Sequence, residues 1–527
     1  MSVSAITSTA LGAVIVALAI GVAENIWADE IDAWPAALQW LVGLGGPALG
    51  AVAGYWVGYE APQRPATTHG SAQFGDDRRT RSALGGPGGL IIGRASGGWL
   101  MRYDGPGHLL TFAPTRSGKG VGVVLPNLLL SDSAILCVDP KGENARIAAR
   151  ARARFGPVHV LDPFEASGQP TASYNPLAAL DPFGLDLAED AALIAEALVY
   201  DPPEQVSEAH WNEEAKALIA GVILHVVTHP PPEGATLAAV RDLLTAAPAR
   251  FAATLKAMQA SPAADGLVAR AANRHLGKAD REATGVLSAA QRHTHFLDSR
   301  RITDSLARAD FAFEDLRDQR ATVFLVLPPE RLGTHARWLR LLVAQALHSL
   351  ARGPTRGGAK PSPVLFLLDE FATLGQLEPL AQAYGLMAGY GVQLWAILQD
   401  LHQLKALYGE RHGTFLANAA VTQVFNVADI DTAQWVSRTL GVTTETFIAH
   451  GSSMNSGTTT SLKGGSSSSG DGESWSEQRV RRDLLTPDEV IRLPDHMMLV
   501  LRPGRDPLIA GKIRHYADSE FSGLHDP

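Results

Sequence analysis

The sequence contains a single cysteine among its 527 residues. This residue, Cys137, lies in the apolar run Ala134 to Val138, where we expect it to be a buried strand residue. A single thiol excludes an internal disulfide framework and a cysteine-based zinc site, and it suits a reducing compartment.

The chain also lacks an excess of positive charge. Its 45 Lys and Arg residues are outnumbered by 54 Asp and Glu residues, which gives a formal net charge of −9 at pH 7. No basic field therefore covers the whole protein, and any contact with nucleic acid must come from local patches or from an assembled channel. The length exceeds what one hydrophobic core can serve, so we expect about two to four structural units.

Two long stretches near the N-terminus, 3–23 and 35–59, carry no charged residue. Each is long enough for one bilayer crossing, which takes about 20 residues. The segment between them contains acidic residues but no Lys or Arg, whereas arginines follow the second stretch from Arg64 onward. The positive-inside rule then predicts a two-helix transmembrane anchor over 1–60, with the bulk of the chain in the cytoplasm. A cleaved signal peptide is the alternative for the first stretch.

One short stretch combines a strand, a loop of small residues and a helix. The run His108 to Phe112 predicts the strand, and Val121 to Leu130 predicts the helix. The Gly-Lys pair between them is typical of a phosphate-binding loop, in which backbone N–H groups and a lysine hold phosphate oxygens at a helix N-terminus. The predicted nucleotide-binding residues are Ala113, Pro114, Thr115, Arg116, Ser117, Gly118, Lys119, Gly120 and Val121.

This loop departs from the consensus at two positions. Ala113 stands where the pattern has Gly, and Gly120 stands where it has Ser or Thr, whose hydroxyl normally binds Mg²⁺. Because Mg²⁺ takes oxygen ligands and often keeps several waters, Asp369, Ser117 or Thr115 could supply part of the missing coordination. We predict that hydrolysis survives without a hydroxyl at residue 120.

A second motif complements the loop. The apolar run Pro363 to Leu368 ends in Asp369 and Glu370. An aspartate at such a strand end binds Mg²⁺, and the following glutamate can activate the water that attacks the terminal phosphate. With the loop, this pair predicts an ATPase that uses ATP and Mg²⁺, with Asp369 as the metal ligand. The predicted catalytic residues are Lys119, Asp369, Glu370 and Gln399.

Polar residues at other strand ends leave alternatives open. Gln399 ends the run Gln393 to Leu398 and either contacts the terminal phosphate or is an exposed residue at a helix start. Asp139 and Lys141 follow the strand of Cys137 and either contact the metal or nucleotide or cap the next helix. At ring interfaces a neighbour's arginine often stabilises the transferring phosphate. The candidates for that role are Arg331, Arg337, Arg340 and Arg438.

The body of the chain alternates continuous apolar runs with helical patterns, which is typical of an α/β fold with a parallel sheet covered on both faces. Residues 180–318 have helical spacing and few strand-like runs, so we predict an inserted all-α domain there. The flanking parts, 61–179 and 319–527, then form one nucleotide-binding domain. The Ser-, Gly- and Thr-rich stretch 450–476 predicts a flexible loop.

Together these motifs resemble those of type IV secretion coupling proteins of the TraG type, the ATPases that serve conjugation and related secretion systems. The resemblance covers most of the chain, and Gly120 is similar to the residue of the TraG branch at this position. Besides the two N-terminal stretches and the phosphate-binding loop, it rests on the segments Val138–Asn144, Asp162–Phe164, Tyr174–Leu177, Leu368–Gly375 and Leu398–Leu404.

The resemblance implies a RecA-like P-loop NTPase domain with an inserted all-α domain, assembled as a homohexamer at the bacterial inner (plasma) membrane. It implies coupling of a relaxase–DNA complex, or of secreted effector proteins, to the channel components of a type IV secretion system. Single- or double-stranded DNA would be bound without sequence preference. Substrate contact by the helical domain would include Trp211 and the segment Glu213 to Val227, which equally fit an ordinary packed helix.

Two other functions stay open on the sequence. One is a double-stranded DNA translocase of the chromosome-segregation type, which would need a C-terminal DNA-reading winged helix. The tail after Gly504 is too short for such a domain and lacks a basic recognition pattern. The other is a membrane scaffold that does not hydrolyse ATP, and the intact Lys119, Asp369 and Glu370 argue against it.

Overall fold

The computed structural model describes residues 67–200, 209–352, 363–461 and 464–526. The chain divides into two compact units, one formed by Met1–Ser71 and Val442–Arg482 and the other by Ala72–Gly441 and Asp483–Pro527. The predicted transmembrane anchor over 1–60 lies outside the described residues. Within the described ranges, no helix combines the length and the apolar character that a bilayer crossing needs.

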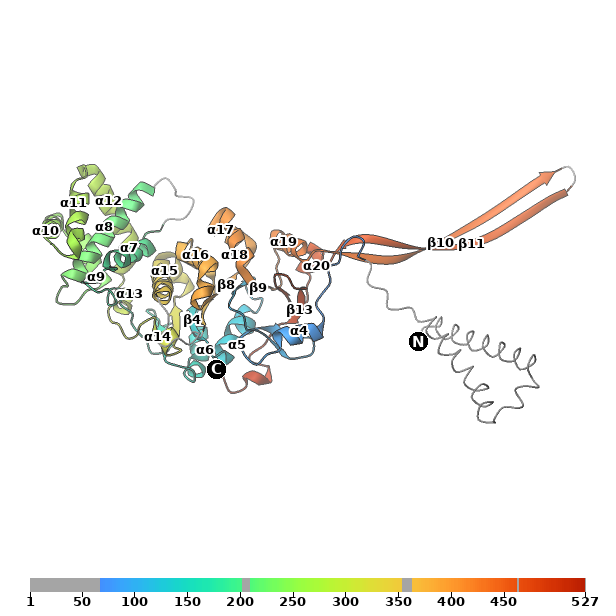
Figure 1. The fold of residues 1–527 in the computed structure, drawn as a ribbon, viewed down its shortest axis with the longest axis horizontal. Helices are drawn as coiled ribbons and strands as arrows, with labels where there is room; N and C mark the ends of the chain where they lie inside the picture. The colour runs from blue at the N-terminus through green and yellow to red at the C-terminus, as the bar shows by residue number, and fades with distance from the viewer. Residues whose placement is uncertain (1–66, 201–208, 353–362, 462–463, 527) are drawn as a thin grey trace, which may run out of the picture. The chain divides into compact units, whose positions relative to one another are not determined.

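The second unit is built on one 11-stranded sheet (Figure 1) with the order β2-β1-β13-β12-β9-β3-β8-β7-β4-β6-β5. The strands from β9 to β5 in this order run parallel, which confirms the predicted α/β fold with a parallel sheet. Their bounds are His108–Phe112 (β3), Ala134–Asp139 (β4), Val158–Leu161 (β5), Thr322–Val326 (β6), Val364–Leu368 (β7), Val392–Leu398 (β8) and Ala419–Val424 (β9).

Each parallel strand contributes side chains to two hydrophobic cores, one on each face of the sheet. In β4, Leu136 and Val138 belong to one core, whereas Ile135 and Cys137 belong to the other. Successive strand residues point to opposite faces, so a strand buried on both sides is apolar along most of its length. This explains the continuous apolar runs of the sequence, and Cys137 is fully buried as expected.

The other end of the sheet is antiparallel, which the sequence did not indicate. It consists of β12 (Met497–Leu501), β13 (Leu508–Gly511), β1 (Leu90–Arg94) and β2 (Leu100–Tyr103). Because β12 runs antiparallel to both β9 and β13, β13 runs in the same direction as β9 and β3. The chain therefore leaves β13 at the same edge of the sheet at which it leaves β3.

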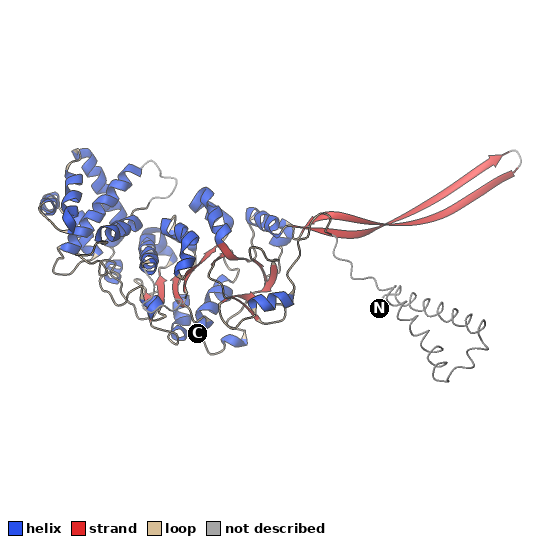
Figure 2. Ribbon diagram, in the orientation of Figure 1, coloured by secondary structure: helices blue, strands red, loops and turns tan. Residues whose placement is uncertain are grey.

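Helices cover both faces of this sheet (Figure 2). Residues of α5 (Leu125–Leu130) and α6 (Glu143–Arg152) join the core on one face. The core on the other face takes residues from α15 (Pro329–Ala351), α16 (Glu378–Leu386), α17 (Leu401–Tyr408), α18 (His412–Asn418), α19 (Ile430–Leu440) and α20 (Pro487–Ile491). The short helix α4 (Asp77–Leu84) precedes β1.

Between β5 and β6 the described residues form helices and no strand. These are α7 (Leu187–Leu198), α8 (Ala209–Thr228), α9 (Leu237–Leu244), α10 (Pro248–Gln259), α11 (Leu267–Leu276), α12 (Asp280–Thr294), α13 (Arg300–Ser305) and α14 (Asp315–Asp318). The expected helical character is confirmed. This region belongs to the same compact unit as the sheet, and α7 packs against α15, so its standing as a domain of its own stays a prediction.

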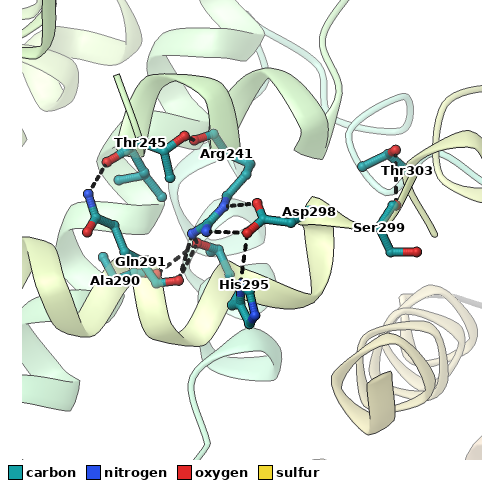
Figure 3. Close-up of polar contacts among 10 residues, drawn as sticks. Arg241, Thr245, Ala290, Gln291, His295, Asp298, Ser299 and Thr303 are labelled. Atoms are coloured by element: carbon teal, nitrogen blue, oxygen red, sulfur yellow. Dashed lines mark hydrogen bonds and ion pairs between the residues drawn. The ribbon is translucent and has the colours of Figure 1, made fainter. Parts of the chain in front are cut away.

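A buried arginine ties the helices of this region together (Figure 3). Arg241 of α9 is 8% exposed, and its Nε and Nη2 donate to the two carboxylate oxygens of Asp298 at 2.7 and 2.8 Å. Its Nη1 donates to the Gln291 carbonyl and to Thr294 Oγ1 at the end of α12. The Arg241 guanidinium, with help from His295, holds the pKa of Asp298 below its usual value. A bidentate ion pair of this kind fixes the orientation of two helices.

In the first unit, the stretch 450–476 differs from the prediction of a flexible loop. The structure has two long strands there, β10 (Val442–Ser461) and β11 (Gly464–Asp483), paired as a two-stranded sheet (Figure 2). The prediction rested on side chains that cannot bury apolar surface, but a hairpin needs only paired backbone groups, and Thr favours extended backbone. The N–H groups of His69 and Gly70 donate to Thr444 Oγ1 at the base of this hairpin.

Candidate nucleotide-binding site

The predicted phosphate-binding loop leaves the sheet at the end of β3. Ala113, its first residue, is fully buried, and the Ala113 N–H donates to the Leu398 carbonyl at 2.8 Å. Arg116 and Gly118 have positive φ angles of 64° and 93°, so the backbone turns sharply before Lys119. Left-handed backbone of this kind lets neighbouring N–H groups converge on one anion, and glycine adopts it without strain.

The loop enters a helix through one π-helical turn, η1 (Gly120–Val124), before α5 begins. Such turns are rare and often occur at functional sites. No atom lies within 4 Å of the place that a Cβ of Gly120 would take, so the missing hydroxyl is not explained by lack of space. At Gly122 a Cβ would lie 3.1 Å from the Ile513 carbonyl oxygen, and this close approach favours glycine.

The strand order brings the four side chains that were predicted to be catalytic next to one another. Strand β8 lies between β3 and β7, so the C-terminal ends of these three parallel strands share one edge. Lys119 Nζ lies 3.0 Å from Asp369 Oδ1 and 2.5 Å from Glu370 Oε1. Gln399 Nε2, at the end of β8, lies 3.5 Å from Glu370 Oε2.

The turn after β7 holds Glu370 in an uncommon backbone conformation. Its φ angle is 54°, a left-handed value that residues other than glycine rarely adopt. The Glu370 N–H donates to Asp369 Oδ1 at 3.0 Å, and its carbonyl accepts from the Thr373 N–H at 2.8 Å. These bonds compensate the strained conformation and fix the backbone from which the carboxylate reaches Lys119.

Burial and charge shift the pKa values of this cluster. Burial alone lowers the pKa of Lys119, but Asp369 and Glu370 outweigh it and raise this pKa above its usual value. Burial raises the pKa of Asp369, although the Lys119 ammonium opposes the shift. The lysine therefore stays charged at neutral pH between the two carboxyl groups.

A cavity of about 570 Å³ opens over the cluster. Its wall is formed by the phosphate-binding loop, the residues after β4, the start of α15 and the residues after β7. The volume lies within the range of small-molecule sites, about 300–1,000 Å³. Two hydroxyl oxygens of these segments, Ser117 Oγ and Thr373 Oγ1, are buried without a hydrogen-bond partner among the described residues.

Asp139, the last residue of β4, and Lys141 in the turn after it both line this cavity. Asp139 is 1% exposed, and its Oδ2 accepts from the Ala145 N–H at 2.9 Å in the first turn of α6. It therefore caps the helix and also lines the cavity, and its contact with a metal or nucleotide stays a prediction. Lys141 is exposed at the rim.

The Asp139 carboxyl predicts a pH dependence of stability. Burial raises its pKa to about 6, while the backbone donors of Ala145 and Lys141 oppose the shift. In the unfolded chain the pKa is near the usual aspartate value of 3.8, so the folded protein retains a proton that the unfolded chain releases over about pH 4–6. Stability then falls as the pH rises through this window. Asp139→Asn should remove this loss, which amounts to about 3 kcal/mol.

Urea unfolding of wild type and Asp139→Asn at a series of pH values from 4.5 to 7 checks this expectation. The variant should gain stability relative to the wild type as the pH rises, and the difference should level off above pH 6. Parallel pH profiles for the two proteins would show that Asp139 titrates normally in the fold.

One arginine proposed for a ring interface is excluded by its own contacts. Arg340 is 4% exposed, and its Nη1 donates to the carbonyls of Leu374 and Gln376 at 2.6 and 2.8 Å. Its guanidinium stacks 4.0 Å from the centroid of the Tyr200 ring. Arg340 therefore braces the segment after β7 within its own chain, and the hypothesis that it reaches a neighbouring subunit is wrong.

The other three candidate arginines lie nearer the surface. Arg337 donates to the Tyr200 carbonyl at 2.9 Å and is partly buried. Arg331 is exposed at the start of α15 and stacks 5.3 Å from the Phe164 ring centroid, beside residues that line the cavity. Arg438 is exposed on α19. Because both side chains are exposed, Arg331 and Arg438 remain candidates for an arginine that reaches the nucleotide site of a neighbouring subunit.

Trp211 behaves as a packing residue in the structure. It is partly buried against the helical core, and its ring approaches Gly285 of α12 so closely that a Cβ there would lie 2.6 Å from Trp211 Cζ3. Ile219 and Val222 of the same helix are fully buried. These contacts fit an ordinary packed helix.

One lysine at the loop, Lys512, could not be predicted from the sequence. Lys512 Nζ donates to the Ser117 carbonyl at 2.9 Å, although the two residues are 395 positions apart. Lys512 follows β13 directly and belongs to no motif. Only the pairing of β13 with β12 brings it to this edge of the sheet.

A parallel sheet with a phosphate-binding loop after one strand and an Asp-Glu pair after a nearby strand defines a P-loop NTPase fold. The model of the family "Type IV secretory system Conjugative DNA transfer" matches residues 76–525. The chain belongs to this family, which confirms the predicted resemblance.

Named relatives agree with this assignment. Two conjugal transfer proteins TraG of Escherichia coli are 31% and 30% identical to the chain over 423 and 468 residues, or 76% and 81% of it. The protein VirD4 of Agrobacterium fabrum is 29% identical over 436 residues, or 82% of the chain. The chain spans 65%, 71% and 62% of the lengths of these three relatives.

Solved structures show the same fold. The unbound form of the bacterial conjugative coupling protein TrwBdeltaN70 has a TM-score of 0.62 at 18% identity and covers 86% of this chain and 96% of its own. The plasmid coupling protein TrwB in complex with the ATP analogue ADPNP has a TM-score of 0.63 at 18% identity, with 86% and 97% covered.

Proposed function

We propose that this chain is an ATPase that couples relaxase–DNA complexes or secreted effector proteins to a type IV secretion channel. The observation that carries the proposal is the placement of Lys119 within 3.0 Å of Asp369 and 2.5 Å of Glu370 beside a cavity of about 570 Å³. Membership of the conjugative DNA transfer family supplies the biological context.

The residues around the cavity fit a nucleoside triphosphate with Mg²⁺. The backbone turn at Gly118 and the Lys119 ammonium suit phosphate oxygens, and the Asp369 carboxylate suits the metal. The buried hydroxyls of Ser117 and Thr373 have no partner among the described residues, and Thr373 lines the cavity, so these hydroxyls could supply part of the coordination that Gly120 lacks. The fold neighbour TrwB has been solved with ADPNP and with ADP and Mg²⁺.

The side chains take complementary roles in hydrolysis. Lys119 binds the terminal phosphate, and Glu370 accepts the proton of the water whose oxygen attacks phosphorus while the bond to the leaving diphosphate breaks. Gln399, 3.5 Å from Glu370, orients that carboxylate or the water. Mg²⁺, when bound at Asp369, neutralises the charge that develops on the phosphate oxygens.

We propose the domain organisation and assembly that the resemblance to the family implies. Residues 61–179 and 319–527 form a RecA-like domain, 180–318 an inserted all-α domain, and 1–60 a two-helix anchor in the bacterial inner (plasma) membrane. Six copies form a ring on the cytoplasmic side, in which Arg331 or Arg438 reaches the neighbouring site. The ring binds DNA without sequence preference and contacts channel components. The uncharged stretches 3–23 and 35–59 support the anchor, and the exposure of Arg331 and Arg438 supports the ring.

Deletion of the gene from a donor strain that carries the secretion system tests the proposal. Conjugal transfer or effector delivery should fall to the background of a donor without the system, and the wild-type gene in trans should restore it. Loss of a secretion ATPase should leave chromosome partition normal. Unchanged transfer together with defective chromosome partition would contradict the proposal and favour a chromosome-segregation translocase.

A further inference from the structure

The strand order places a second lysine at the phosphate-binding loop. Strand β13 runs in the same direction as β3, so Lys512 leaves the sheet at the edge where the loop begins. The Lys512 backbone N–H donates to the His496 carbonyl at 2.8 Å, which anchors the residue beside β12. The Lys512 side chain then extends from a fixed backbone toward the loop.

Three uncharged groups hold the Lys512 ammonium. Nζ donates to the Ser117 carbonyl at 2.9 Å and to Asn426 Oδ1, and it lies 4.8 Å from the centroid of the Phe425 ring. Asn426 is oriented in turn, because its Nδ2 donates to the Leu493 carbonyl at 2.6 Å. The ammonium is thus pinned against the loop without a carboxylate among these partners.

The contact with Ser117 acts on the peptide group that precedes Gly118. The C=O and N–H of one trans peptide point in opposite directions. Since the Ser117 carbonyl points to Lys512, the Gly118 N–H points away from it, and Gly118 borders the cavity. Glycine has no Cβ to restrict its backbone, so Gly118 adopts its positive φ of 93° without strain, and an outside contact is what holds the preceding peptide in one orientation.

The segment after Lys512 packs on the same part of the chain. The Ile513 carbonyl oxygen approaches Gly122 of η1, and a Cβ on Gly122 would lie 3.1 Å from it. His515 is buried, with Nδ1 3.3 Å from the Val121 carbonyl. The loop and the first turn of its helix are therefore braced along their length by the C-terminal segment.

We propose that Lys512 is a positioning residue for nucleotide binding: it orients the Ser117–Gly118 peptide so that the Gly118 N–H faces the phosphates, and its ammonium, which forms no ion pair with the described residues, adds to their attraction. The inference deepens the proposed ATPase and rests on it. Burial lowers the pKa of Lys512 to about 8, opposed by Asp495, so the ammonium is mostly protonated at neutral pH.

Binding of a fluorescent ATP analogue to the full 527-residue chain tests this role. Lys512→Met keeps the apolar stem but removes the charge and the donor, and the dissociation constant should rise about tenfold, since a hydrogen bond from a charged group is lost. KM for ATP should rise by the same factor with little change in kcat, because chemistry takes place at Lys119 and Glu370. Lys512→Arg should recover most of the affinity.

Lys256→Met is the matched control, because Lys256 is an exposed lysine on α10. It should bind the analogue as the wild type does. If Lys512→Met lowers the melting temperature, Asn426→Ala is tested in its place, because it removes one of the groups that hold the Lys512 ammonium. Weaker binding of the ATP analogue by Asn426→Ala supports the role of Lys512, and unchanged binding overturns it. A folded Lys512→Met chain with wild-type affinity also overturns it. A wild-type chain that binds no nucleotide would instead refute the proposed ATPase.

Discussion

Replacement of Lys119 by alanine should lower ATP turnover by about 10²–10³-fold or more, the loss found when one preorganised group that stabilises transition-state charge is removed. Its ammonium is the cation closest to both Asp369 and Glu370, at 3.0 and 2.5 Å. Without it the terminal phosphate would lose the cation that offsets these two carboxyl groups. Phosphate release by the purified chain in the presence of DNA measures the effect.

Two further variants separate this catalytic loss from a general loss of structure. Removal of the ammonium leaves Asp369 buried without its cation, which costs stability. Lys119→Arg keeps the charge and should keep the melting temperature, yet a planar guanidinium does not replace a compact ammonium in the loop, so turnover should still fall. Lys256→Ala, on the exposed face of α10, should keep wild-type turnover.

A transfer assay with Lys119→Ala tests whether ATP hydrolysis is needed for secretion. If Lys119→Ala supports transfer as well as the wild type while its membrane abundance is unchanged, the chain acts as a scaffold and not as a motor. We expect transfer to be lost, because the lysine is held in the geometry of a working site.

Glu370→Gln should reduce hydrolysis by about 10²–10⁴-fold, the usual contribution of a general base, while nucleotide binding is kept. The amide has the shape of the carboxylate but cannot accept the proton of the attacking water. Lys119 would also lose one of its two anionic partners, so the affinity for ATP should hold or increase. Single-turnover hydrolysis and analogue binding, measured on the same preparation, separate the two steps.

Gln399→Ala is the companion to this variant. The Gln399 amide lies 3.5 Å from Glu370, its one hydrogen-bond partner among Lys119, Asp369 and Glu370, so Gln399→Ala should reduce hydrolysis less than Glu370→Gln does. Near wild-type hydrolysis by Glu370→Gln would place the base elsewhere. Asp139, buried at the same edge with a pKa near 6, would then be the next group to test.

Local patterns account for the parts that the sequence predicted. The run Val364–Leu368 is apolar throughout and His108–Phe112 is mostly apolar, because both faces of the sheet are covered, and such runs are visible in any linear pattern. The loop before Lys119 and the pair Asp369 and Glu370 are short contiguous motifs at the ends of these strands. If these strands are parallel, their C-terminal ends lie at the same edge of the sheet, so the loop and the Asp-Glu pair are expected to form one nucleotide-binding site.

Burial and long-range pairing account for the parts that the sequence missed. Arg340 was a candidate for a ring interface because its exposure cannot be inferred from one sequence, and the fold buries it against Tyr200. The stretch 450–476 was assigned as a loop because composition describes side-chain burial, whereas the pairing of β10 with β11 is made by backbone groups.

By itself, then, the sequence determined the α/β class, the phosphate-binding loop and its Asp-Glu partner, because each depends on residues close together in the chain. Only the tertiary structure decided which other groups complete the site. The return of the chain through β12 and β13 brings Lys512 to the Ser117 carbonyl across 395 positions, and the turn after β7 brings the Thr373 hydroxyl to the cavity. Contacts of this kind depend on strand order and direction, and no local pattern encodes them.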